Sequence, residues 1–97
     1  MFFKKDFCKL FFKKFVHTLD LSGTNVYDVS KLINVHTLDL SDTKVINVSS
    51  LYNVYKLNLC NTNVRDVSML TKVHTLYLCN TQVTDVSMLV NVSELDF

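Results

Sequence analysis

Residues 16–34 read VHTLDLSGTNVYDVSKLIN, and the same nineteen-residue unit returns over residues 35–53, 54–72 and 73–91. A partial fifth copy, VSELDF, occupies residues 92–97. A fixed period of roughly twenty residues is typical of a solenoid, in which each coil packs only on its neighbours. The sequence therefore predicts one repeat domain over residues 16–97, with a separate segment, residues 1–15, before it.

Apolar residues hold the same places in every full copy, in the pattern V-x-x-L-x-L-x-x-T-x-V-x-x-V-x-x-L. The two-residue step in L-x-L puts both leucines on one face of a short strand. The later three-residue steps fit a turn or a short 3₁₀ segment on the return side of the coil. We expect these columns to form the core; their first members are Val16, Leu19, Leu21, Val26, Val29 and Leu32.

This pattern resembles the leucine-rich repeat, whose core reads L-x-x-L-x-L-x-x-N/C-x-L. The tail D-V-S-x-L is similar to the D-I-x-x-L segment of short internalin-type repeats. The resemblance implies an α/β-type solenoid with a parallel β-sheet on one side and short turn or 3₁₀ segments on the other. The unit is slightly shorter than the family's usual length of about 20 to 29 residues, which requires a tight return side.

Threonine stands where the family pattern has asparagine or cysteine. A hydroxyl donates one hydrogen bond, whereas an asparagine amide can donate two and also accept. We therefore expect a weaker hydrogen-bond ladder between coils than in related proteins. The threonines concerned are Thr24, Thr43, Thr62 and Thr81.

The segment before the repeats, MFFKKDFCKLFFKKF, carries five lysines and one aspartate. Phe3, Phe7, Phe11 and Phe15 recur every four residues with lysines opposite them, which predicts an amphipathic helix over residues 1–15. We expect this helix to cap the first coil, because the ends of a solenoid need a polar-faced cover. A helix lying on a membrane surface and a degenerate extended repeat remain alternatives.

Charge and cysteine usage narrow the class of protein. The formal net charge is +1, so the chain lacks the basic footprint of a nucleic-acid-binding domain. No clean signal peptide opens the chain and no stretch is long enough to span a bilayer, which favours a cytoplasmic protein. Cys8, Cys60 and Cys79 have no metal-ligand spacing. Cys60 and Cys79 fall in one column, but neighbouring parallel strands orient their side chains badly for bridging, so we expect free thiols.

Two polar columns could carry chemistry, and both have structural interpretations. Histidines and one tyrosine stand directly before the strands and should form a row along the sheet. In a straight row of copied residues, the side chains do not converge as the ligands of a metal must, and no single base is paired with a nucleophile. The sequence thus predicts no enzyme, metal site or cofactor. The second column should accept backbone N–H bonds in Asx-turns; it consists of Asp28, Asn47, Asp66 and Asp85.

The outward strand positions are the predicted contact surface. They combine acidic and amide side chains with one lysine and one tyrosine, and tyrosine is a favoured anchor of protein interfaces. The residues expected to bind a partner are Asp20, Asp39, Lys56, Asn58, Thr75, Tyr77 and Asp96. Five strands about 4.8 Å apart offer only a few hundred Å², so the partner should be bound weakly or be a short peptide.

Three kinds of function therefore stay open. The first is a non-catalytic protein–protein interaction module that binds a protein or peptide, of unknown identity, through the strand face. The alternative is a structural segment of a longer or self-associating solenoid, with association through the C-terminal edge. Peripheral attachment to a membrane through the basic N-terminal helix is a further alternative.

Overall fold

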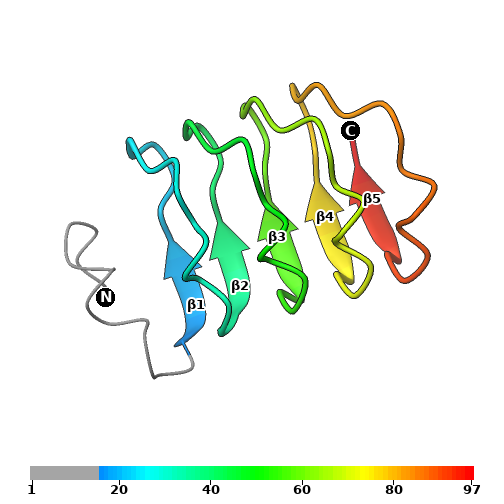
Figure 1. Ribbon diagram of the computed structural model, residues 1–97, viewed down its shortest axis with the longest axis horizontal. Coiled ribbons are helices and arrows are strands. Elements are labelled where there is room, and N and C mark those ends of the chain that lie inside the picture. The colour runs from blue at the N-terminus through cyan, green and yellow to red at the C-terminus, as the bar shows by residue number, and fades with distance from the viewer. Residues whose placement is uncertain (1–15) are drawn as a thin grey trace.

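The computed structural model describes residues 16–97, which form stacked coils with a five-stranded parallel sheet along one side (Figure 1). Strands that are consecutive in the chain are also neighbours in the sheet. Each strand residue pairs with its equivalent one copy later, as Leu38 does with Leu57. The strands are β1 (Val16–Asp20), β2 (Val35–Asp39), β3 (Lys56–Asn58), β4 (Thr75–Tyr77) and β5 (Glu94–Asp96). The predicted solenoid with a parallel sheet is confirmed.

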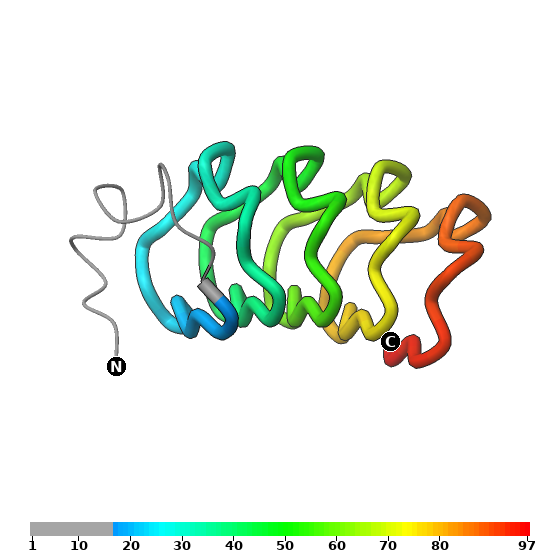
Figure 2. The backbone as a smooth tube through the Cα atoms, turned by 90° about the horizontal axis from the view of Figure 1, so that it is seen from below, coloured from blue at the N-terminus to red at the C-terminus, as the bar shows by residue number. Residues whose placement is uncertain are grey.

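Figure 2 shows the backbone of successive coils stacked side by side, and the buried apolar side chains of these coils form one core cluster. The leucine of the strand centre is at most 1% exposed in the first four copies, and the second leucine of L-x-L is at most 2% exposed. Burying one such side chain contributes about 1.5 to 3 kcal/mol. The apolar columns read from the sequence are therefore the inward-facing positions of the solenoid.

The return side of each coil is a turn. The N–H of Leu32 donates to the carbonyl of Val29 at 3.0 Å, and the three later copies repeat this bond between equivalent residues. Residues 16–97 contain strands and turns but no helix, so the expected α/β-type description is wrong for this part of the chain. A nineteen-residue coil that must also turn at both ends leaves too little length for a helical return. The predicted capping helix, residues 1–15, lies outside the described residues.

A tight turn with a left-handed residue follows each of the first four strands. The residue at this place is Gly23 with φ of 70°, and its equivalents Asp42, Asn61 and Asn80 have φ between 55° and 60°. Glycine, asparagine and aspartate are the residues that adopt this conformation most readily. The sequence contains this column of turn formers, although the apolar repeat pattern does not predict its left-handed conformation.

The threonine column closes this turn instead of linking coils. The Thr43 hydroxyl donates to the carbonyl of Leu40 at 2.6 Å, and the equivalent bonds in the other copies measure 2.7 to 2.8 Å. The hydrogen bonds that join neighbouring coils at this level include backbone bonds, such as Asn61 N–H to the carbonyl of Cys79 at 2.8 Å. Threonine therefore serves as a local turn lock, and the expectation of a weaker ladder remains a prediction.

The fifth copy is less buried than the others. Leu95 of β5 is 37% exposed, whereas its equivalent Leu76 in β4 is fully buried. Phe97 is 64% exposed, and Val83 and Leu89 in the preceding coil are each 9% exposed. Apolar surface is thus available at the β5 edge of the described coils.

Candidate functional site

The outward face of the sheet contains a groove of about 390 Å³ that crosses four strands. Five of the seven residues predicted to bind a partner line it, together with neighbouring threonines and leucines of β1 and β2. These five are Asp20, Asp39, Lys56, Asn58 and Tyr77. Thr75 is only 4% exposed, and Asp96 lies on β5 outside this groove. Whether any of these residues binds a partner stays a prediction.

Local hydrogen bonds fix the acidic end of the groove. Oδ1 of Asp39 accepts the backbone N–H of Ser41 at 2.9 Å and its hydroxyl at 2.7 Å. Asp20 makes the same pair of bonds with Ser22 in the first coil. Because these bonds hold the carboxylates in one orientation, the groove presents preorganised negative charge to a ligand.

The other end of the groove carries a cation and an aromatic ring. Nζ of Lys56 lies 5.9 Å from the centre of the Tyr77 ring, at the outer limit of a cation–π contact. The two side chains come from β3 and β4, which are hydrogen-bonded neighbours. The groove is therefore polarised, with carboxylates over β1 and β2 and a lysine and tyrosine over β3 and β4.

A stack of four aromatic rings runs along the start of the strands. The centres of His17, His36, Tyr55 and His74 are 4.4, 4.9 and 4.6 Å apart in succession, with interplanar angles of 7° to 19°. Nδ1 of each histidine lies 2.8 to 2.9 Å from the hydroxyl of the threonine that follows it. The predicted row is confirmed, and face-to-face packing with a threonine lock on each imidazole explains its regularity. Among residues 16–97, no three histidine, cysteine or acidic side chains gather as a metal site would require.

The fifth copy adds a chain of hydrogen bonds that the repeat pattern did not predict. Ser93 takes the place of an aromatic residue, and its hydroxyl lies 2.6 Å from Nε2 of His74. Nδ1 of His74 contacts Thr75, whose hydroxyl donates to Glu94 at 3.3 Å. The serine–histidine contact resembles a nucleophile beside its base. Its signal in the sequence was the departure of Ser93 and Glu94 from the earlier copies.

This hydrogen-bonded chain lacks the surroundings of an acyl-transfer site. The backbone N–H groups of Ser93 and Glu94 both donate to the carbonyl of His74, so neither is available to stabilise an oxyanion. Ser93 is exposed, and it does not line the strand-face groove. The contacts therefore fit a structural role, which is to join the fourth and fifth copies.

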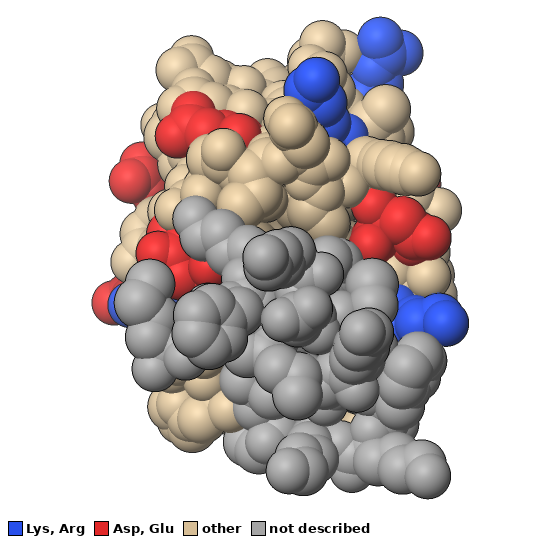
Figure 3. All heavy atoms as spheres, turned by 90° about the vertical axis from the view of Figure 1, so that its left-hand side faces the viewer, with Lys and Arg blue, Asp and Glu red and all other residues tan. Residues whose placement is uncertain are grey.

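The Asx-turns predicted on the return side are present in all four full copies. The backbone N–H of the following serine donates to Asp28, Asn47, Asp66 or Asp85 at 2.9 to 3.0 Å. Hydrogen bonds from the backbone N–H and from the hydroxyl of that serine lower the pKa of the three aspartates below its ordinary value, because they favour the ionised carboxylate; for Asp66 the hydroxyl of Ser68 is the larger cause. Seen from the N-terminal end, acidic side chains lie on both flanks of the solenoid (Figure 3).

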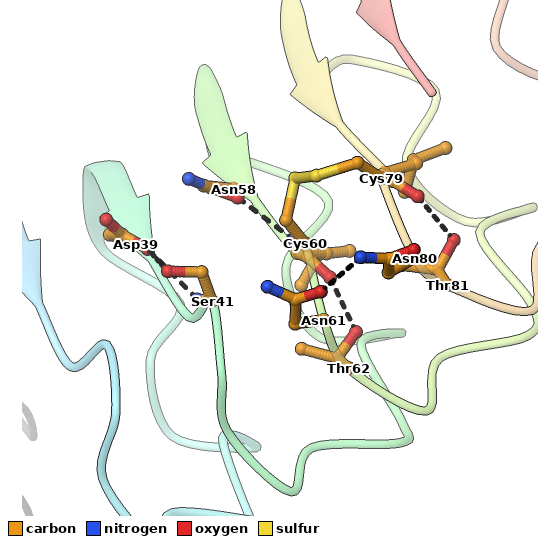
Figure 4. The surroundings of a disulfide bond; sticks show 11 residues. Asp39, Ser41, Asn58, Cys60, Asn61, Thr62, Cys79, Asn80 and Thr81 are labelled. Atoms are coloured by element: carbon orange, nitrogen blue, oxygen red, sulfur yellow. Dashed lines mark hydrogen bonds between the residues drawn. A yellow bond between two sulfur atoms is a disulfide. The ribbon is translucent and has the colours of Figure 1, made fainter.

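A disulfide joins Cys60 and Cys79, so the expectation of free thiols is wrong for this pair (Figure 4). The Cα atoms are 4.6 Å apart, within the range of about 4.4 to 6.8 Å that bridges require. The expectation failed because both cysteines lie just beyond the ends of β3 and β4, where the chain turns and side chains no longer follow strand geometry. Nδ2 of Asn80 also donates to Oδ1 of Asn61 at 2.7 Å, which adds a second link between these coils.

Three solved structures share this arrangement of coils. The functional domain of InlJ from Listeria monocytogenes matches with a TM-score of 0.68 and 23% identity, over 82% of this chain and 20% of that one; it includes a cysteine ladder. An internalin, InlF, from the same organism matches with 0.68 and 21%, over 84% and 28%. Internalin C2 of that organism matches with 0.58 and 28%, over 84% and 50%.

These matches show that the chain has the leucine-rich-repeat fold, as the sequence predicted. The chain spans half or less of the length of each of these structures. Models of protein families give no match, and neither do curated proteins. Within residues 16–97, no helix has the length and apolar character needed to cross a membrane.

Proposed function

We propose that this chain is a non-catalytic protein-interaction module that binds a short segment of polypeptide through the outward face of its sheet. The observation that supports this most is the groove across β1 to β4, because it brings together side chains from four consecutive coils. Side chains on hydrogen-bonded strands are held more precisely than side chains on loops. The leucine-rich-repeat fold is compatible with a binding role of this general kind.

The size of the face supports a peptide instead of a large globular partner. Five strands at about 4.8 Å span roughly 20 to 25 Å, and the area is well below the roughly 800 Å² that each side of a standard interface buries. The partner would place a basic group near Asp39 and an apolar or aromatic group against Tyr77. We expect the affinity to be modest, because only a few side chains can be fully desolvated.

Short random peptides displayed on a surface provide a test that does not require the natural partner. Peptides selected on the wild-type chain should lose binding to Tyr77→Ala and should bind Asp39→Asn more weakly. Tyr27→Ala is the matched control, because Tyr27 is a tyrosine that is 65% exposed and does not line the strand-face groove. Selected peptides that bind Tyr77→Ala normally and fail on Tyr27→Ala would overturn the proposal.

Self-association through the β5 edge is the second candidate, supported by the exposure of Leu95 and Phe97. A strand edge with apolar neighbours favours pairing with another chain. We expect concentration-dependent association through residues 83–97 that Leu95→Lys suppresses. Light scattering that reports a monomer at high micromolar concentration would contradict this candidate.

The disulfide bears on where the protein works. Bridges persist in oxidising compartments and are rare in the reducing cytosol. The Cys60–Cys79 bridge therefore argues against the cytoplasmic location expected from the sequence, and we propose an oxidising environment instead. Thiol labelling of the protein in intact cells tests this, because a cytosolic protein would keep both thiols reactive.

A further inference from the structure

The second coil differs from the other three in the residue that begins its return-side Asx-turn. Asp28, Asp66 and Asp85 each begin an Asp-Val-Ser turn, whereas the second coil has Asn47 followed by Val48 and Ser49. Asn47 keeps the geometry of the turn, since its Oδ1 accepts the backbone N–H of Ser49 at 2.9 Å and the Ser49 hydroxyl at 2.7 Å. The turn uses only the carbonyl oxygen of the amide. Among the described residues, no acceptor takes a hydrogen bond from its Nδ2.

We propose that Asn47 is a site of N-linked glycosylation. Asn-x-Ser with a residue other than proline between the two is the acceptor pattern for this modification, and Asn47-Val48-Ser49 satisfies it. Asn47 is exposed, so a bulky substituent on Nδ2 can extend into solvent without displacing the core. The aspartates of the other coils have no amide nitrogen and cannot accept the sugar.

The chemistry is a transfer of an oligosaccharide from a lipid pyrophosphate donor by a transferase of the secretory pathway. A bond forms between Nδ2 of Asn47 and C1 of the first sugar, while the bond from C1 to the pyrophosphate oxygen breaks. The lipid pyrophosphate leaves with the electron pair, and a carboxylate of the transferase takes one amide proton. Nothing is oxidised or reduced in this step.

The disulfide is an independent observation that points to the same pathway. N-linked sugars are attached to surface sites of secreted proteins, and the same oxidising route allows bridges to form. The Cys60–Cys79 bridge lies in the third and fourth coils, outside the Asn47 turn. Two features in different coils therefore indicate one cellular route.

Exposed apolar side chains that a sugar could cover lie beside Asn47. Asn47 lines a hollow of about 360 Å³ together with Ile46 and Met69, which are 60% and 55% exposed. Tyr27, at the position equivalent to Ile46 one coil earlier, is 65% exposed. A glycan at Asn47 would cover this apolar surface on the return side and leave the strand-face groove open.

A second Asn-x-Ser sequence, Asn91-Val92-Ser93, is a poorer acceptor in the folded chain. Nδ2 of Asn91 donates to the carbonyl of Thr71 at 2.8 Å, and the Ser93 hydroxyl contacts His74. A sugar on Asn91 would replace one of the two Nδ2 hydrogens and crowd the first contact. The structure thus distinguishes two matches to the same short pattern.

The test is to secrete the full chain from a eukaryotic cell through a cleavable leader and to measure its mass before and after enzymatic removal of N-linked sugars. We expect a glycan on Asn47, detected after removal as conversion of that asparagine to aspartate. Asn47→Asp should abolish it while keeping the turn, because the other coils hold aspartate at this place. Ser49→Ala should also abolish it, whereas Ser68→Ala, in the equivalent turn of the third coil, should not.

Asp66→Asn supplies a matched gain of site, because it places an Asn-Val-Ser turn of the same geometry one coil later. We expect this variant to carry a second glycan. An unmodified Asn47 in secreted protein that contains the Cys60–Cys79 bridge would overturn the proposal. If Asp66→Asn is modified in that case, the surroundings of Asn47 block the transfer. If Asp66→Asn is also unmodified, the turn itself does not accept the sugar. Either result overturns the proposal.

Discussion

Replacing Leu57 by alanine should cost about 2 to 5 kcal/mol of unfolding free energy. Leu57 is fully buried in β3, and its register partners Leu38 in β2 and Leu76 in β4 are buried on either side of it. The coils on both sides fix the walls around the side chain, so the space left by alanine cannot collapse. This loss is a large part of the total stability of a small domain, which is about 5 to 15 kcal/mol.

The same substitution at the end of the same column is the internal control. Leu95 is 37% exposed, and among residues 16–97 its register partner is Leu76 alone. Leu95→Ala removes less buried surface and leaves no enclosed cavity, so we expect a loss of about 1 kcal/mol. Asn58→Ala, at an outward position beside Leu57, should also cost little, since it removes mainly one turn hydrogen bond with Cys60.

Urea denaturation followed by circular dichroism measures the three free energies on one scale. The expected order of destabilisation is Leu57→Ala first, with Leu95→Ala and Asn58→Ala far behind. Equal losses from Leu57→Ala and Asn58→Ala would refute the inward and outward assignment of the strand positions. Equal losses from Leu57→Ala and Leu95→Ala would show that Leu95 is covered in solution, as self-association at the β5 edge would cause.

Three further predictions concern the turns and the bridge. Asn61→Val should cost about 1 to 2 kcal/mol more than Asn61→Gly in denaturant unfolding, because valine resists the left-handed φ of 60°; equal costs would contradict this. Replacing Cys60 and Cys79 by serine should lower the stability by about 3 kcal/mol, since the bridge closes a loop over 19 residues; reductant should lower the melting temperature of the wild type but not of the double variant. The lowered pKa of three aspartates gives stability that is present above the ordinary value of 3.8 and lost as the pH falls through their folded values. The stability of a variant with asparagine at all three positions should therefore fall less on acidification than the stability of the wild type, and the same pH dependence in both proteins would refute the role of Asp28, Asp66 and Asp85.

The inward and outward columns of the repeat were predictable because every coil of a solenoid repeats the same local structure. Each strand pairs with its own equivalent, so the inward position of Leu19 in the first copy also assigns Leu38, Leu57 and Leu76. The same logic predicted the Asx-turns and the row of rings. Asn47 departs from this logic in one respect. Its Asx-turn was predictable from the repeat, but the consequence of having an amide in place of a carboxylate could be judged only after the structure showed that all four turns have the same geometry.

The turns after the strands were harder to predict, for physical reasons. Asp42, Asn61 and Asn80 differ from Gly23 in size and charge, and what they share is tolerance of positive φ. The Cys60–Cys79 bridge could not be predicted from strand geometry, because the turn after each strand sets the directions of the two cysteine side chains.

The groove also combines predictable and unpredictable parts. The strand columns placed Asp20, Asp39, Lys56, Asn58 and Tyr77 on one face. Periodicity did not indicate that Thr75 would be buried, because its equivalents Thr18 and Lys56 are exposed. The contact of Thr75 with Glu94 is specific to the fifth copy and therefore has no precedent in the earlier coils, whereas its contact with His74 repeats the histidine–threonine contacts of the first two coils.

Titration of the ¹⁵N-labelled chain with a selected peptide, followed by NMR, tests the proposed strand-face function most directly. Amide signals of Asp39, Lys56, Asn58 and Tyr77 should shift together, while those of Ile46 and Met69 on the return side should stay in place. Shifts concentrated around Ile46 and Met69, with the strand face unaffected, would contradict the proposal that this protein binds its partner through the outward face of the sheet.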